Sequence, residues 1–225
     1  MRFSIHVRSV ISALLLSILL LMSGCGDTVA TGRAVYMLMD TSGTYTNQLQ
    51  KAQMIISYLL STLDSGDSLA VARIDSGSFS EKDIIAKVTF DSRPSVATSQ
   101  KRAFRNEIDT FIKSVKSSPY TDISGGMLQA AEYLDETGAG ERHILIFSDM
   151  KEEIQKGHNR DFELPMDGIE VVALNVTKLN SDNVDPRLYL ERLDMWNKRV
   201  VSGGGSWRVI NDLDHVESIL DDREG

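Results

Sequence analysis

The sequence predicts an α/β domain: a doubly wound, mostly parallel sheet with one antiparallel edge strand and helices on both faces. Two observations predict this fold class. Continuous apolar runs, such as residues 33–39 and 143–147, are typical of strands that are buried on both faces. Between such runs, apolar residues recur at helical spacing, and strands that alternate with helices form parallel sheets covered by helices.

The first half of the domain is expected to supply three strands and two helices. Residues 33–39 form an apolar run that ends at Asp40, as a central parallel strand does. The strands expected at 68–74 and 84–90 are separated by only a short loop around Gly77, which predicts that they pair antiparallel. The expected elements, in order, are a strand at 33–40, a helix at 46–63, strands at 68–74 and 84–90, and a helix at 97–116.

The second half is expected to supply three strands and three helices. A helix with apolar residues from Ile123 to Leu134 should stop at Gly138, since glycine favours helix ends. Gly203 to Gly205 is interpreted as a turn before the last strand. The expected elements are a helix at 122–136, strands at 143–147 and 169–176, a helix at 186–199, a strand at 207–210 and a closing helix around Val216, Ile219 and Leu220.

Composition excludes several classes of protein. The chain has 225 residues, of which 42% are apolar and 25% charged, so it can bury a core and is not a disordered tail. The formal net charge is −8 and no basic stripe is present, so nucleic acid is not an expected partner. The single cysteine, Cys25, excludes a disulfide scaffold and a thiolate zinc site.

Residues 1–24 are expected to be a signal peptide and not part of the fold. Two arginines precede an apolar stretch of 13 residues, Val10 to Met22, which is short for a membrane span. The following Met22-Ser23-Gly24-Cys25 resembles the lipobox of bacterial lipoproteins. This resemblance implies cleavage before Cys25 and lipidation of its thiol. The alternative is an uncleaved signal anchor in which Cys25 is incidental.

Residues 25–32 are then a short lipidated tether, and 33–225 form one domain. Gly26 follows Cys25, and by resemblance to Gram-negative lipoproteins this implies the outer membrane, with the domain facing the periplasm. We therefore expect a bacterial envelope protein held to the membrane by its lipid anchor.

Polar side chains follow two of the predicted strands and open one predicted helix. Asp40, Ser42 and Thr44 come directly after the first strand, and Asp149 comes after the strand at 143–147. Thr121 opens the helix at 122–136. Because ligands of open parallel sheets bind beyond the carboxyl ends of the strands, these residues are expected on one edge of the sheet.

This pattern resembles the metal-ion-dependent adhesion site of the von Willebrand factor A domain family. The family carries Asp-x-Ser-x-Ser after the first strand, a threonine before a central helix and an aspartate after the fourth strand. In this sequence the matching residues are Asp40, Ser42, Thr44, Thr121 and Asp149. Two departures are Thr44 for the third-position serine and Met150 for the usual glycine after the aspartate.

The candidate ligands are two carboxylates and three hydroxyls, without His or Cys. Hard divalent cations prefer such oxygen ligands, so Mg²⁺ is the first expectation, with Mn²⁺ or Ca²⁺ as alternatives. The two carboxylates neutralise the ion, and it stays electrophilic toward an outside carboxylate. The expected partner is therefore a protein that presents an Asp or Glu side chain, and the expected function is binding, not catalysis.

Two other functions stay open at this point. The first is a metal-dependent, phosphatase-like hydrolase with Asp40 as nucleophile, although Ser42 stands where such enzymes need a second aspartate. The second is a structural domain without a functional metal site, in which Asp40 and Ser42 cap the following helix. Neighbouring residues receive structural interpretations: Asp122 as a helix cap or solvated residue, Glu152 and Glu153 as a solvated helix start, and His143, Trp196 and Trp207 as structural or packing residues.

Overall fold

A computed structural model describes residues 32–74 and 80–220, without the side chains of Thr44, Thr46 and residues 214–216. The predicted signal peptide, Cys25, nearly all of the tether and the loop around Gly77 lie outside the described residues. Among the residues that are described, no helix combines the length and the apolar character that a membrane crossing requires.

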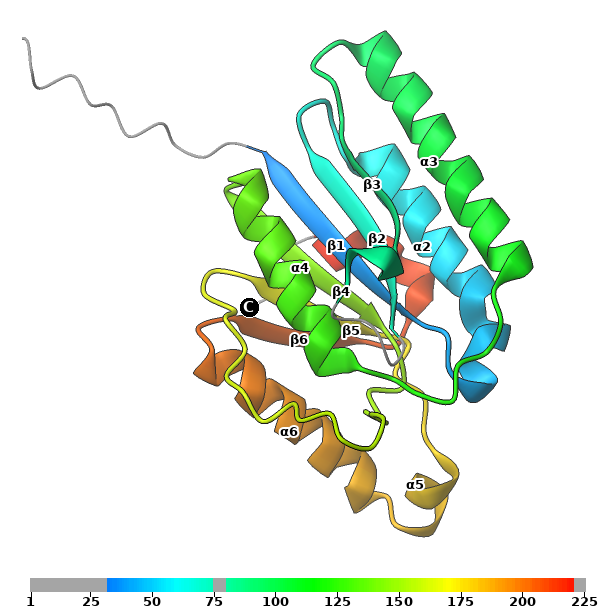
Figure 1. Cartoon of the computed structure of the whole chain (residues 1–225), viewed down its shortest axis with the longest axis vertical. Helices are drawn as coiled ribbons and strands as arrows, with labels where there is room; N and C mark the ends of the chain where they lie inside the picture. Colours follow the sequence, from blue (N-terminus) through cyan, green and yellow to red (C-terminus); the bar gives the residue numbers. More distant parts are fainter. Residues whose placement is uncertain (1–31, 75–79, 221–225) are drawn as a thin grey trace, which may run out of the picture. The chain divides into compact units, whose positions relative to one another are not determined.

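The domain is built on a six-stranded sheet with the strand order β3-β2-β1-β4-β5-β6 (Figure 1). Neighbouring strands are parallel except β2 and β3, which pair antiparallel at one edge. The predicted fold class is therefore confirmed. The strands are β1 (Arg33–Asp40), β2 (Ser68–Ile74), β3 (Ile84–Thr89), β4 (Glu141–Phe147), β5 (Glu170–Leu174) and β6 (Ser206–Ile210).

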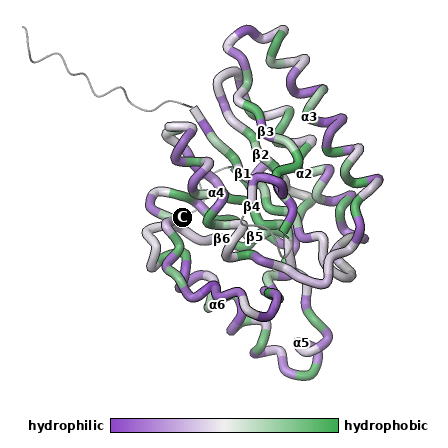
Figure 2. Tube along the Cα trace, viewed as in Figure 1, coloured by the Kyte–Doolittle hydropathy of each residue, from purple (hydrophilic) through white to green (hydrophobic). Residues whose placement is uncertain are grey.

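Helices cover both faces of this sheet (Figure 1). One apolar layer holds α2 (Leu49–Thr62), α3 (Pro94–Ser114) and the 3-10 helix η3 (Leu213–Leu220) against the sheet. The other layer holds α4 (Ile123–Thr137) and α6 (Arg187–Ser202). Successive residues of β1 belong to alternate layers, so both faces of the strand are buried and its sequence is continuously apolar; Figure 2 shows this concentration of hydrophobic residues in the sheet.

The structure differs from the sequence expectation at several helix ends. The helix predicted from residue 46 begins as a 3-10 helix, η1 (Gly43–Gln48), and becomes α-helical only at Leu49. Helix α3 starts earlier than predicted, at Pro94, since proline fits the first helical turn. The closing helix is 3-10, and two short helices, η2 (Glu81–Asp83) and α5 (Asn180–Val184), were not predicted.

The strand order reverses between β1 and β4. From β1 the chain continues to β2 on one side, and from β4 it continues to β5 on the other. The two strands are parallel neighbours, with Met39 paired to Phe147. The residues that follow, Asp40 and Ser148, therefore leave the sheet side by side at its switch point, which is where parallel sheets bind ligands.

Candidate metal centre

Asp40 lies at the carboxyl end of the parallel strands, at the switch point of the sheet. It ends β1 and is fully buried. Its Oδ1 accepts a hydrogen bond from the Ser42 backbone amide at 2.7 Å, and its Oδ2 accepts one from Ser148 Oγ at 2.7 Å. The first bond fixes the backbone directly after β1, and the second ties this segment to the end of β4.

The carboxyl groups of Asp40 and Asp149 are both withdrawn from solvent. Burial raises the pKa of Asp40 above its usual range, although hydrogen bonds from Ser42 and Ser148 act against this, and the Asp149 charge raises it further. Burial also raises the pKa of Asp149, against the opposing charges of Arg192 and Lys151. Because burial penalises the charged form of each carboxylate, a cation bound next to them would stabilise both charges.

Backbone hydrogen bonds hold the three loops of the site together. The Ser118 amide donates to the Thr41 carbonyl at 2.8 Å, which ties the loop before α4 to the loop after β1. Thr121 and Glu153 exchange two hydrogen bonds of 2.8 Å as a short antiparallel bridge. This bridge ties the loop before α4 to the loop after β4, so all three predicted segments do converge on one edge.

The structure separates the predicted ligands into half-buried residues that line a pocket and fully buried ones. Ser42 and Asp149 line a pocket of about 510 Å³, together with Gly43, Ser118, Lys151 and Glu153. Asp40 and Thr121 are buried and do not line this pocket. The side chain of Thr44 lies outside the described residues, and only its backbone, within η1, is defined.

The donor set fits a hard divalent cation. Its oxygens come from two carboxylates whose charge balances that of Mg²⁺, and hydroxyl groups supplement them. No group of three or more His, Cys, Asp or Glu side chains in residues 32–74 and 80–220 is arranged to hold a metal. A site here would therefore depend on Asp40 and Asp149 for its charge and on hydroxyls for its remaining protein ligands.

Met150 occupies the position after Asp149, where the resemblance leads us to expect glycine. Its backbone is left-handed, with φ of 63°, so this position has the conformation that glycine adopts most easily. The Met150 side chain is fully buried in the apolar layer under α4 and α6. The Met150 amide donates to Ser148 Oγ at 3.0 Å. Packing and hydrogen bonding thus hold a methionine in a backbone conformation that normally favours glycine.

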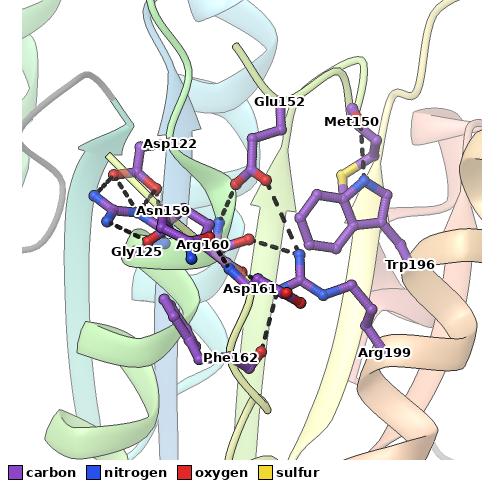
Figure 3. A network of polar contacts seen from close by, with 11 residues as sticks. Asp122, Gly125, Met150, Glu152, Asn159, Arg160, Asp161, Phe162, Trp196 and Arg199 are labelled. Atoms are coloured by element: carbon purple, nitrogen blue, oxygen red, sulfur yellow. Dashed lines mark hydrogen bonds and ion pairs between the residues drawn. The ribbon is translucent and has the colours of Figure 1, made fainter. Parts of the chain in front are cut away.

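A polar network fixes the start of α4 next to Thr121 (Figure 3). Asp122 is fully buried, accepts the Gly125 amide at 2.9 Å as the helix cap and forms a salt bridge with Arg160. Glu152 accepts the Ser124 amide at 2.7 Å. The cap interpretation of Asp122 is confirmed. The interpretation of Glu152 and Glu153 as a helix start is wrong, because no helix begins at these residues. The Glu152 carboxylate binds the first turn of α4 and the Glu153 backbone pairs with Thr121, while the Glu153 side chain is solvent-exposed as expected.

The structural interpretations of Gly203–Gly205, His143 and Trp196 are confirmed, and the structure adds the contacts that these residues make. Gly203 to Gly205 does turn the chain into β6, and a side chain at Gly203 would meet the Leu164 carbonyl oxygen at 1.9 Å. His143 is buried, and its Nδ1 lies 2.9 Å from a Glu170 carboxylate oxygen. Trp196 is a fully buried packing residue, and its indole nitrogen also donates to the Met150 carbonyl at 2.9 Å.

The sequence did not indicate which residues support the candidate ligands. These are Ser148, Glu152, Arg160, Arg192 and Trp196. Ser148 had a visible signal, since it follows the same strand as Asp149. Arg192 and Trp196 share one face of α6 by their i, i+4 spacing, but this spacing alone does not indicate what that face contacts.

Comparisons with known proteins bear on the fold. No model of a known protein family matches the sequence, and no curated protein matches it. Among solved structures, a von Willebrand factor type A protein from Catenulispora acidiphila is similar with a TM-score of 0.52 and 12% identity, over 84% of this chain and 41% of that one. The pilus adhesin SpaC from Lactobacillus rhamnosus GG is similar with a TM-score of 0.53 and 11% identity, over 85% of this chain and 29% of that one.

This chain thus corresponds in length to less than half of either structure. An aerotolerance-related membrane protein from Bacteroides fragilis is also similar, with a TM-score of 0.47 and 14% identity, over 84% of this chain and 96% of that one. At such identities the likeness concerns the fold alone. The sheet order, the helical layers and the likeness to the Catenulispora acidiphila structure agree: the chain has the fold of a von Willebrand factor A domain.

Proposed function

We propose that this chain is a lipid-anchored protein of the bacterial envelope whose domain binds a divalent metal ion and, through it, a carboxylate of a partner protein. Mg²⁺ is the proposed ion, with Mn²⁺ or Ca²⁺ as alternatives. The observation that carries the proposal is the convergence of Asp40 and Asp149 at the switch point of the sheet. Both carboxyl groups have raised pKa values there, and Ser42 and Asp149 open onto a pocket.

The five residues have different proposed tasks. Ser42 and Asp149 line the pocket, so they are the side chains best placed to touch an ion that enters from solvent. Asp40 is fully buried and contributes charge while it orients Ser42. Thr44 and Thr121 complete the set by resemblance to the adhesion site. When bound, the ion supplies an electrophilic centre that an outside Asp or Glu completes.

The burial of Asp40 counts against the hydrolase alternative. A nucleophilic carboxylate must reach the substrate, but Asp40 has no exposed surface and each of its oxygens already accepts a hydrogen bond. The position two residues later, where such enzymes carry an acid or base, holds Ser42, which has neither role at neutral pH. Binding without turnover is therefore the proposed activity.

The proposed anchor rests on the sequence. The lipobox-like Met22-Ser23-Gly24-Cys25 follows a short apolar stretch, and Gly26 supports the outer membrane with the domain facing the periplasm. Several acyl chains on one residue anchor a protein firmly, because each buried methylene contributes about 0.8 kcal/mol.

Calorimetric titration of the purified full chain with Mg²⁺ tests the metal site. A phosphatase assay under the same conditions tests the alternative activity. Saturable binding without turnover supports the proposal, whereas turnover that disappears in Asp40→Asn supports the hydrolase. Affinity capture of envelope proteins with and without EDTA then tests the partner: a protein retained only in the presence of the metal is expected, and capture that EDTA does not change contradicts the metal-bridged mode.

A further inference from the structure

One face of α6 makes successive contacts with the loop that carries Asp149. Arg192 Nε donates to the Asp149 carbonyl at 3.0 Å, and Trp196 Nε1 donates to the Met150 carbonyl at 2.9 Å. Arg199 continues the same face beyond Trp196 (Figure 3), and it donates to Ser124 Oγ at 2.7 Å. The spacing i, i+4, i+7 places all three donors on one side of the helix.

Arg192 is itself held rigidly. Its terminal nitrogens donate to both carboxylate oxygens of Asp182, at 3.2 and 2.8 Å. The side chain of Asp182 is fully buried and that of Arg192 is 11% exposed. The planar guanidinium therefore uses one edge for Asp182 and its Nε for the Asp149 carbonyl, which an ammonium group at this position cannot reproduce.

A continuous chain of hydrogen bonds connects α6 to the buried carboxylate of the site. Trp196 bonds the Met150 carbonyl, the Met150 amide bonds Ser148 Oγ, and Ser148 Oγ bonds Asp40 Oδ2. Met150 stands at the centre of this chain with its left-handed backbone. Since that conformation is unfavourable for methionine, the contacts on both sides of Met150 are what keep the loop in it.

We propose that Arg192 and Trp196 are positioning residues of the metal site: α6 holds the Asp149–Met150 turn in the geometry that places Asp149 for metal binding. This inference rests on the proposed function, because it concerns the same site. Outer contacts that orient a ligand change metal affinity by about 10- to 100-fold when they are removed. The helix is thereby part of the metal site although none of its side chains is a ligand.

The test uses two variants of the full chain. Trp196→Phe keeps an aromatic ring but lacks the N–H group, and Arg192→Lys keeps the charge but lacks the planar guanidinium. Lys198→Met is the matched control, because Lys198 lies on the same helix, is 75% exposed and pairs only with Asp194 among the contacts described. Mg²⁺ affinity is measured by calorimetry. Hydrogen exchange of the Glu153 amide, which bonds the Thr121 carbonyl, is measured in the metal-free protein.

Both α6 variants are expected to bind Mg²⁺ about 10-fold more weakly, with the control unchanged. In the metal-free protein, exchange at Glu153 should accelerate while β1 amides keep their protection. Unchanged Mg²⁺ affinity together with unchanged hydrogen exchange in both variants overturns the proposal. Hydrogen exchange that accelerates equally at Glu153 and in β1 also overturns it, because this indicates a merely structural role. If the unmodified chain binds no Mg²⁺, the proposed function fails and the positioning role fails with it, and accelerated exchange at Glu153 then shows only that α6 stabilises the loop.

Discussion

Ser148 Oγ donates a 2.7 Å hydrogen bond to Asp40 Oδ2 and thereby joins the ends of β4 and β1. Both oxygens of Asp40 are engaged, since Oδ1 accepts the Ser42 amide. Asp40 therefore supports the backbone of the site in addition to supplying charge. A substitution that removes its acceptors disturbs two loops, so asparagine, which keeps one acceptor oxygen and the shape, is the more informative change.

Asp40→Asn is expected to weaken Mg²⁺ binding by more than about 100-fold, because it removes one of the two carboxylates that balance the ion's charge. Calorimetric titration measures the effect. Asp64→Asn is the charge-matched control, since Asp64 is exposed in the turn before β2, away from the switch point. Wild-type affinity in Asp40→Asn contradicts the site assignment.

Met150→Gly and Met150→Ala should separate backbone strain from packing. Both remove a fully buried side chain and should lower the free energy of unfolding by about 2–5 kcal/mol. Only glycine relieves the left-handed backbone, so Met150→Gly should be more stable than Met150→Ala by about 1 kcal/mol. Urea unfolding of the two variants measures the difference, and equal stabilities mean that position 150 carries no strain.

Arg160→Met should destabilise the domain by about 3 kcal/mol, because it leaves the buried Asp122 carboxylate without its cation. Adding Asp122→Asn removes the charge but keeps an oxygen that can accept the Gly125 amide, and it should restore part of the lost stability. A double-mutant cycle by urea unfolding gives the coupling energy. Additive effects of the two substitutions indicate that the pair contributes nothing.

The environment of Glu170 predicts how the stability of the fold depends on pH. Burial alone would raise its pKa, but the hydrogen bonds from His143 and Arg208 prevail and hold the pKa below its ordinary value of 4.5. A carboxyl group with a lowered pKa in the folded state stabilises the fold above its unfolded pKa, and this contribution is lost as pH falls through the folded pKa.

Glu170→Gln should therefore cost about 2 kcal/mol at pH 7 and progressively less below the ordinary pKa of the group. Urea unfolding of both proteins between neutral and acid pH measures the difference. Glu81→Gln is the control, because the pair of Glu81 with Lys87 is exposed and should contribute less than about 1 kcal/mol. If the stability lost in Glu170→Gln stays constant with pH, ionisation of Glu170 is not the source of the pH dependence.

Cys25→Ser should leave the precursor uncut and without lipid, because the thiol is the group that the proposed anchor modifies. Mass spectrometry of the protein extracted from membranes measures both. Ser23→Thr, which keeps Cys25, is the comparison for general effects on the segment. Normal acylation of the Cys25→Ser variant contradicts the lipoprotein assignment.

Much of the fold was predictable because its central strands are buried on both faces. Residues 33–39 are apolar without interruption, and the structure shows why: β1 is central and contributes side chains to both apolar layers. Helix ends were less predictable. The segment from Gly43 to Gln48 became a 3-10 helix, which hydrophobic spacing does not distinguish from the first turn of an α-helix.

The convergence of Asp40, Thr121 and Asp149 on one edge also followed from the sequence, because parallel strands with helical crossovers place their carboxyl ends together. The sequence did not indicate that Glu152 would bind the start of α4 or that Glu153 would pair with Thr121. Both depend on a loop of irregular structure, in which residue spacing says little about direction.

The sequence by itself determined the alternation of strands and helices, and with it the edge of the sheet where the candidate ligands lie. Only the tertiary structure decided which side chains support them. Arg192 and Trp196 reach the Asp149–Met150 turn across more than 40 residues of chain, and the packing of α6 against this turn brings them together. Local hydrophobic periodicity encodes which face of a helix is buried, but the partner of a buried donor is fixed only when the whole layer packs.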